Sequence, residues 1–216
     1  NSQVSVNNTL GFSIVKYTGN NTAGATVGHG MDAVPELIIW KGLTSVSGWK
    51  VYCNQFTSPT TQVVELQDTA AVSTNTVFIN GTAPSTSLIT LGAYGDTNGS
   101  GQDIITYNFT SKPGFSKVGS YTGTGSAGQY VVTGFEPAFV MVKTTSSTSS
   151  WFILDNKRNS NNPRNSYLMA NSSTATTNAG TGINFLSNGF ELESTAFNDP
   201  ADWIYLAFAA DGSTAT

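Results

Sequence analysis

The chain has 216 residues, and its nine Lys and Arg against thirteen Asp and Glu give a formal net charge of −4. This charge offers no long-range attraction to phosphate backbones or anionic lipids, and no stretch approaches the ~18 apolar residues of a membrane helix, so neither nucleic acid nor membrane insertion is expected. A single cysteine, Cys53, excludes an intrachain disulfide framework, and its place beside Val51 predicts a buried or half-buried strand position.

An internal repeat is the dominant feature of the sequence. Matched blocks occur in the same order in both halves: residues 11–13 with 114–116, 17–19 with 121–123, 35–41 with 137–143, Trp49 with Trp151, and 103–109 with 202–208. Ordered matches at nearly constant spacing indicate duplication of a unit of about 100 residues. We therefore expect an N-terminal segment at residues 1–10, a first repeat at 11–110, a linker at 111–113 and a second repeat at 114–216.

Within each repeat, the apolar runs are short, rich in β-branched and aromatic residues, and bounded by Gly, Asn, Ser and Thr. In the first repeat they predict strands at residues 13–17, 36–40, 49–53, 62–66, 76–79, 87–91 and 104–109. No window shows a helical stripe. The sequence thus predicts an all-β protein of two tandem antiparallel β-sandwich repeats, jelly-roll-like, and the short linker predicts that they pack against each other.

Further along the chain, two patterns refine the predicted strands. Residues 37–40 and 139–142 are continuously apolar, which predicts strands covered on both faces. Residues 183–192 read as a hairpin with Asn188 and Gly189 at the turn, because both residue types tolerate positive φ.

Candidate catalytic groups are few. His29 is the only histidine and lies between glycines, with Thr133 as its counterpart in the second repeat. It is expected to be a solvent-facing loop residue rather than a catalytic one. Glu191 and Glu193 lie two apart on a predicted strand, hence on one face, where paired acids could serve glycoside hydrolysis. The simpler interpretation is a solvated strand face, so no enzyme and no cofactor are expected.

Two further sets of residues could bind ligands. Asp96 and Asp103 lie in a Gly- and Asn-rich loop whose oxygens could hold Ca²⁺, although the spacing matches no defined calcium loop. Asp103 and Asp202 also share a position before the last strand of each repeat, which favours a structural role. Trp49 and Trp151 are either repeated core residues or, if exposed, stacking platforms for sugar rings.

The matched blocks resemble a tandem β-repeat found in virion proteins of tailed bacteriophages, chiefly those of marine cyanobacteria. The residues that carry the resemblance are 11–20, 35–41, 134–143 and 185–190. The resemblance implies a structural component of the virion surface that contacts other virion proteins and forms homo-oligomers, trimeric in a fibre. It supplies no catalytic residue and no established binding residue.

Three functions follow, in descending order of expectation. The first is a non-enzymatic tail-fibre or host-attachment module that binds host surface glycans. The second is an architectural virion protein, such as a capsid decoration or fibre, that acts by oligomerisation. The third is a glycan-cleaving enzyme that uses Glu191 and Glu193.

Overall fold

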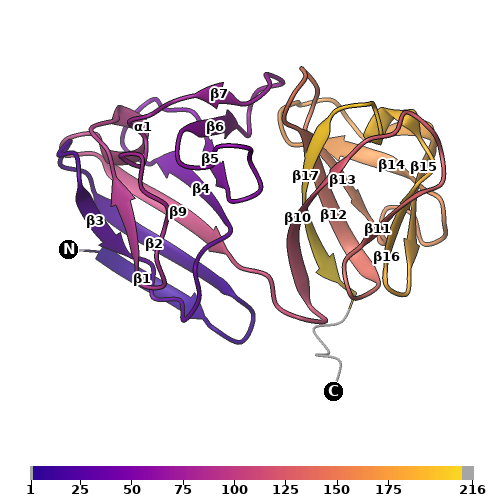
Figure 1. Ribbon diagram of the computed structural model, residues 1–216, viewed down its shortest axis with the longest axis horizontal. Coiled ribbons are helices and arrows are strands. Elements are labelled where there is room, and N and C mark those ends of the chain that lie inside the picture. Colours follow the sequence, from indigo (N-terminus) through magenta and orange to yellow (C-terminus); the bar gives the residue numbers. More distant parts are fainter. Residues whose placement is uncertain (1, 211–216) are drawn as a thin grey trace. The chain divides into compact units, whose positions relative to one another are not determined.

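The computed structural model describes residues 2–210, and its regular elements are strands apart from one short helix and one 3₁₀ turn, which confirms the all-β prediction (Figure 1). The chain divides into two compact units. The first takes the described residues up to 67 together with residues 72–110, and the second takes residues 68–71 and those from 111 onward. Among the described residues, no helix is long or apolar enough to cross a membrane.

The first unit is a sandwich of a large and a small antiparallel sheet. The large sheet has the order β1 (Ser2–Asn7), β2 (Phe12–Thr18), β9 (Asp103–Phe109), β4 (Leu37–Gly42), β5 (Lys50–Cys53), β6 (Gln62–Glu65), β7 (Ser73–Thr74). The small sheet pairs β3 (Ala25–Gly28) with β8 (Leu88–Leu91), and helix α1 (Gly95–Asn98) precedes β9. Alternation along β2 and β9 places buried side chains on the face toward the small sheet, where the core lies.

The second unit has one continuous eight-stranded antiparallel sheet. Its order is β10 (Ser116–Thr122), β17 (Asp202–Ala209), β12 (Pro137–Thr144), β13 (Phe152–Asp155), β14 (Arg164–Met169), β15 (Thr177–Leu186), β16 (Gly189–Leu192), β11 (Gln129–Val132). A 3₁₀ turn, η1 (Thr195–Phe197), takes the place of α1. A separate cluster of buried apolar residues forms the core of this unit.

The strand order confirms the duplication. The series β2-β9-β4-β5-β6 recurs as β10-β17-β12-β13-β14, and the pair β3–β8 recurs as β11–β16. In the second unit the long strand β15 joins that pair to the large sheet, whereas the first unit has only the two-residue β7 beyond β6. Each unit therefore has the same frame and a core of its own.

The register of the first strands differs from the sequence match by one residue. Phe12 pairs with Phe109, and Ser116 pairs with Phe208 at the equivalent place. Phe12 therefore corresponds to Ser116 in the sheet, although the Gly-Phe-Ser blocks align it with Phe115. The second unit has one more residue ahead of this strand, and strand pairing, not sequence identity, defines the equivalent positions used below.

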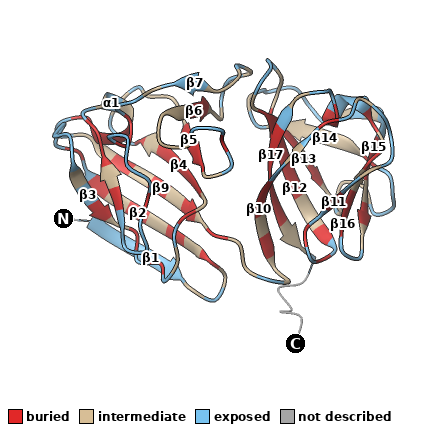
Figure 2. Ribbon diagram, in the orientation of Figure 1, coloured by how far each residue is buried: buried red, intermediate tan, exposed pale blue. Residues whose placement is uncertain are grey.

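The N-terminal boundary of the first repeat also needs correction. Residues 2–7, assigned to a separate segment, form β1 and pair along their whole length with β2. All six β1 residues are exposed, and the strand lies at the edge of the large sheet (Figure 2). Among the residues described for the second unit no such strand occurs, and β10 lies at the sheet edge.

The predicted strand at residues 76–79 is wrong. The segment bends, although Phe78 and Ile79 are fully buried. Its backbone is held by other groups: Thr97 Oγ1 donates to Phe78 O at 2.9 Å, and Val77 N donates to Asn75 Oδ1 at 3.1 Å. An apolar run indicates that its side chains are buried. Here they are buried in a loop whose backbone groups are hydrogen-bonded by side chains.

The predicted hairpin of residues 183–192 is confirmed, but its turn is shifted. Leu186 pairs with Gly189, so Ser187 and Asn188 form the two-residue turn. Neither Asn188 nor Gly189 has a positive φ. A Cβ on Gly189 would stand 2.1 Å from Val131 O, so glycine is needed here for the close approach of β11.

The buried runs behave largely as the sequence indicates. Leu37–Trp40 is buried throughout, and Val140–Val142 is buried while Phe139 is half-buried. Cys53 is also buried, as predicted, and burial raises the pKa of its thiol to about 12.

Candidate functional site

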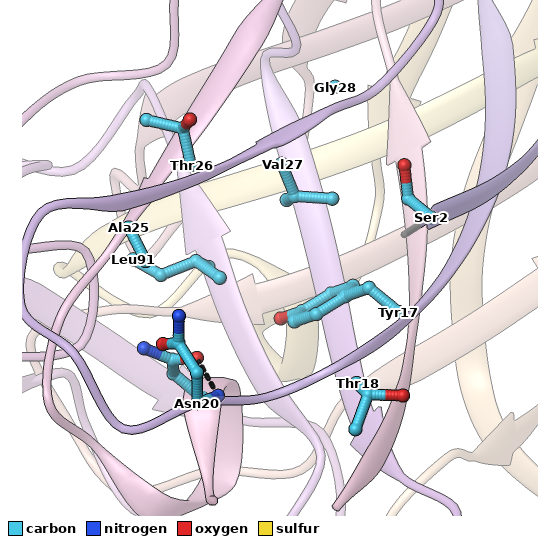
Figure 3. A pocket seen from close by; sticks show the side chains of 10 residues that line it. Ser2, Tyr17, Thr18, Asn20, Ala25, Thr26, Val27, Gly28 and Leu91 are labelled. Atoms are coloured by element: carbon cyan, nitrogen blue, oxygen red, sulfur yellow. Dashed lines mark hydrogen bonds between the residues drawn. The ribbon is translucent and has the colours of Figure 1, made fainter. Parts of the chain in front are cut away.

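A cavity of about 260 Å³ opens in the first unit between the end of β2 and the small sheet (Figure 3). It is lined by Ser2, Tyr17, Thr18, Asn20, Ala25, Thr26, Val27, Gly28, Leu91 and Asn98. These residues come from β1, β2, the loop after β2, β3, β8 and α1. The volume lies just below the ~300 to 1,000 Å³ of drug-sized ligand sites, so it suits a small ligand such as one sugar residue.

Two buried side chains fix the inner wall of this cavity. Tyr17 Oη donates a hydrogen bond to Thr97 O, and burial raises the pKa of the Tyr17 hydroxyl well above its ordinary value. Asn98 is 1% exposed and uses its whole amide: Oδ1 accepts from Asn20 N at 2.9 Å, and Nδ2 donates to Thr22 O at 3.1 Å and Gly92 O at 2.9 Å. Asn98 thus fastens the loop after β2 beside the cavity.

The lining is neutral at any physiological pH. None of the ten lining residues described is an acid, a histidine or a lysine. Ser2 and Asn20 supply hydroxyl and amide groups, and Ala25, Val27 and Leu91 supply apolar surface. The Thr26 side chain points to the side of β3 opposite Val27 (Figure 3), and the Thr18 hydroxyl donates to Asp103. Such a wall can hydrogen-bond and pack against an uncharged polar molecule.

Beside this cavity, a second hollow of about 190 Å³ shares the Tyr17 and Thr18 walls. Its other lining residues are Gln3, Lys16 and Asp103, and Lys16 Nζ lies 2.9 Å from Asp103 Oδ2. The neutral cavity therefore has an ion pair near its rim.

The fastening of the inner wall recurs in the second unit. Tyr121 Oη donates to Phe197 O at 2.7 Å, as Tyr17 does to Thr97 O. Asn198 Oδ1 accepts from Thr124 N at 2.9 Å, and its Nδ2 donates to Ser126 O at 2.6 Å. The repeated Tyr-Thr-Gly blocks are thus structural anchors for the loop after the first strand.

The two predicted stacking residues differ in exposure. Trp151 is 1% exposed and offers no ring face to a sugar in this structure. Trp49 is half-buried: its ring stacks on Tyr107 at a centroid distance of 6.4 Å, and Lys41 Nζ lies 5.7 Å from the ring centroid. Trp49 can therefore present only part of its ring surface to a sugar. Neither tryptophan lines the cavity.

The two aspartates proposed for Ca²⁺ contact different lysines. Asp96 Oδ2 lies 3.3 Å from Lys50 Nζ, whereas Asp103 pairs with Lys16. Across residues 2–210 there is no group of three or more His, Cys, Asp or Glu side chains arranged to hold a metal. Hydrogen bonds from Lys16 and Thr18 lower the pKa of the Asp103 carboxyl.

A structural role for the two repeated aspartates agrees with the contacts. Thr18 Oγ1 donates to Asp103 Oδ1 at 3.0 Å, and Thr122 Oγ1 donates to Asp202 Oδ1 at 2.9 Å. In both units the carboxylate ties the first residue of the last strand to the last residue of its neighbour.

The prediction that His29 faces solvent is wrong, because the residue is fully buried. Nδ1 accepts from Met31 N at 3.2 Å and Nε2 lies 3.1 Å from Ser85 O, which selects the neutral tautomer protonated at Nε2. Burial lowers the pKa of His29. At the equivalent position Thr133 Oγ1 accepts from Phe135 N, so both side chains close the same turn.

Glu191 and Glu193 are brought together as their spacing indicates. Asn184 Nδ2 donates to Glu191 Oε2 at 3.1 Å and to Glu193 Oε1 at 2.9 Å. The shared amide gives the pair a structural partner on β15.

The cavity itself was not predicted from the sequence. Its inner wall carried a signal, because Tyr17 belongs to a repeated block, but Asn20, Thr26 and Asn98 stand in stretches without a distinctive motif.

Residues 1–211 match the family model of a domain of unknown function, DUF7483, which spans both units. Searches of curated proteins and of solved structures find no match.

Proposed function

The chain belongs to the DUF7483 family, and we propose that it is a non-enzymatic module of the virion surface that binds host glycans. The neutral cavity of the first unit carries this proposal. Neutral sugars present many hydroxyl groups and have apolar ring faces, which matches a wall of hydroxyl, amide and aliphatic groups. The virion setting rests on the resemblance of the repeated blocks to phage virion proteins.

None of the lining residues described titrates near neutral pH, which argues for binding without chemistry at this place. Acid–base catalysis requires a group that exchanges a proton near neutral pH, within hydrogen-bond reach of the substrate. Tyr17 is the sole ionisable side chain among the residues that line the cavity, and its raised pKa keeps it protonated.

An array of immobilised bacterial surface glycans tests the proposal. The protein, displayed at high valency, should bind a subset of the array and compete with phage adsorption. Ala25→Trp should abolish both effects, because Ala25 lines the cavity with a small methyl group and a larger side chain on the same face of β3 fills it. Thr74→Trp, on the exposed strand β7 away from the lining residues, is the matched control. Absence of binding by the unaltered protein, or binding that survives Ala25→Trp, would overturn it.

One observation favours an architectural function as the second candidate. Strand β1 is exposed throughout, carries no charge or proline, and keeps Val4 and Val6 each 43% exposed at the sheet edge. Such an edge can pair with β1 of a second copy. Light scattering should then show an oligomer that Val4→Lys dissociates, with Val46→Lys, in an exposed loop, as control. A monomer at high concentration would exclude this candidate.

A further inference from the structure

The second unit shows what fills the equivalent of the cavity. Ala25 pairs with Leu91 in the small sheet, and Gln129 pairs with Leu192 at the same place in the second unit. The glycines that precede Ala25 and Gln129 support this equivalence, because Gly24 N donates to Leu91 O and Gly128 N donates to Leu192 O. Gln129 therefore stands where the first unit has Ala25, a cavity-lining residue.

The Gln129 side chain spans the gap between the two sheets. Its Nε2 donates to Thr122 O at 2.9 Å, from β11 to the end of β10. Thr122 pairs with Asp202 as Thr18 pairs with Asp103, so Thr122 and Thr18 are equivalent. Thr18 also lines the cavity. The second unit thus occupies its own site with a carboxamide, while the first unit, with a methyl group at residue 25, leaves the site open.

On this basis, and resting on the glycan-binding function proposed above, we infer that the cavity takes the acetamido group of an N-acetylated sugar. The N–H of that group replaces Gln129 Nε2 and donates to Thr18 O. Its methyl group lies against the aliphatic wall of Ala25, Val27 and Leu91. The sugar ring extends toward the hydroxyl and amide groups of Ser2 and Asn20, which are exposed and line the cavity.

The chemistry of the wall distinguishes this ligand from its near relatives. A plain hexose offers hydroxyl groups but no methyl group for the aliphatic wall, so it loses the apolar contact. An unacetylated amino sugar brings a cation into a lining without a carboxylate. The acetamido group supplies a neutral donor and an apolar methyl group together.

Ligand-observed NMR with N-acetyl-D-glucosamine and D-glucose as probes tests the inference. The acetyl methyl protons should receive the strongest saturation, and N-acetyl-D-glucosamine should bind at least about tenfold more tightly than D-glucose. Ala25→Gln should weaken binding at least about tenfold, because the new carboxamide occupies the site as Gln129 does. Ala25→Ser keeps a small side chain and should retain binding.

The reverse change gives an independent readout. Gln129→Ala should open the second unit and add a weaker site, since the described part of that unit, up to residue 210, has no strand equivalent to β1. Equal binding of both sugars, or an Ala25→Gln variant that binds as well as the unaltered protein, would overturn the inference. So would preference for a glutamine dipeptide over the sugar.

The two proposals fail differently. If the glycan array gives binding that Ala25→Trp abolishes but no preference for acetylated sugars, the function stands and the inference falls. If neither the array nor the monosaccharide gives binding, both fall. Binding of N-acetyl-D-glucosamine without any effect on phage adsorption would support the inference and exclude the proposed role in host attachment.

Discussion

Lys50 and Phe152 occupy the same strand position in the two units, yet their surroundings have opposite chemistry. Lys50, on β5, lies beside Glu65 and Asp96, with the Tyr94 ring 5.7 Å from its Nζ. Burial lowers its pKa, but hydrogen bonds to Glu65 and Tyr94 outweigh that effect and raise the pKa above its ordinary value. The first unit therefore places a charged network at this position.

Phe152, on β13, is the centre of an aromatic group instead. Its ring meets Tyr167 at a centroid distance of 5.2 Å and Phe197 at 5.1 Å, both edge to face. Strand pairing relates the two sites, because Lys50 faces Glu65 and Phe152 faces Met169. One frame accepts either a buried ion pair or an aromatic cluster, provided that the partners change together.

The largest effect is expected from removal of the aromatic centre. Phe152→Ala leaves a cavity between Tyr167 and Phe197 and should lower the free energy of unfolding by roughly 3 to 5 kcal/mol. Chemical denaturation followed by circular dichroism measures the loss. Val132→Ala, at a residue 58% exposed, should stay within about 0.5 kcal/mol. A loss below about 1 kcal/mol for Phe152→Ala would show that the ring cluster does not support the second unit.

A paired exchange tests whether facing residues change together. Val15 faces Thr106 in the first unit, and Gly119 faces Tyr205 at the equivalent place in the second. A Cβ on Gly119 would lie 2.5 Å from the Tyr205 ring, so Gly119→Val should cost about 2 kcal/mol through overpacking.

Adding Tyr205→Thr restores the pair found in the first unit. A double-mutant cycle should then give a favourable coupling of about 1 kcal/mol or more. Strict additivity of the two changes would contradict the view that Gly119 is small because Tyr205 is large.

The same logic applies to the charged position with a smaller effect. Lys50→Phe alone leaves Glu65 and Asp96 without their cation and should cost about 1 to 2 kcal/mol, because both carboxylates are partly exposed. Lys50→Phe with Glu65→Met imports the facing pair of the second unit and should recover most of that loss. Thermal unfolding compares the three proteins, and a double variant less stable than the single one would refute the exchange.

The smallest effect concerns acid sensitivity at His29. Burial lowers the folded-state pKa, so the neutral ring contributes stability above the unfolded pKa of about 6.5, and this stability is lost as pH falls below it. His29→Thr copies Thr133 and keeps an acceptor for Met31 N. Between pH 7 and pH 5 the melting temperature should fall by a few degrees more in the unaltered protein than in the variant. Parallel pH profiles would show that His29 carries none of the acid sensitivity.

Particular residues explain how much of the fold could be predicted from the sequence. Duplication, strand type and the burial of Cys53 follow from pattern, because alternation and repeated blocks are local signals. The edge strand β1 was not predicted, because none of its residues is buried. A strand was wrongly predicted at residues 76–79, because burial of Phe78 does not require a strand.

The sequence pattern did not predict the cavity, for a different reason. It depends on the difference between Ala25 and Gln129, which is meaningful only when strand pairing fixes the equivalence of the two positions. The Gly-Phe-Ser blocks align the copies one residue out of register, as the pairing of Phe12 and Ser116 shows. His29 likewise reads as an exposed loop residue until its two backbone partners are seen.

The central claim is that the first unit holds an open site that the second unit fills with its own side chain. Titration of the ¹⁵N-labelled protein with N-acetyl-D-glucosamine tests it most directly. The account predicts chemical-shift changes at the backbone amides of Thr18, Asn20 and Thr26 and none at the equivalent amides around Thr122 and Tyr130. Changes centred on the second unit, or none in the first at saturating sugar, would contradict it.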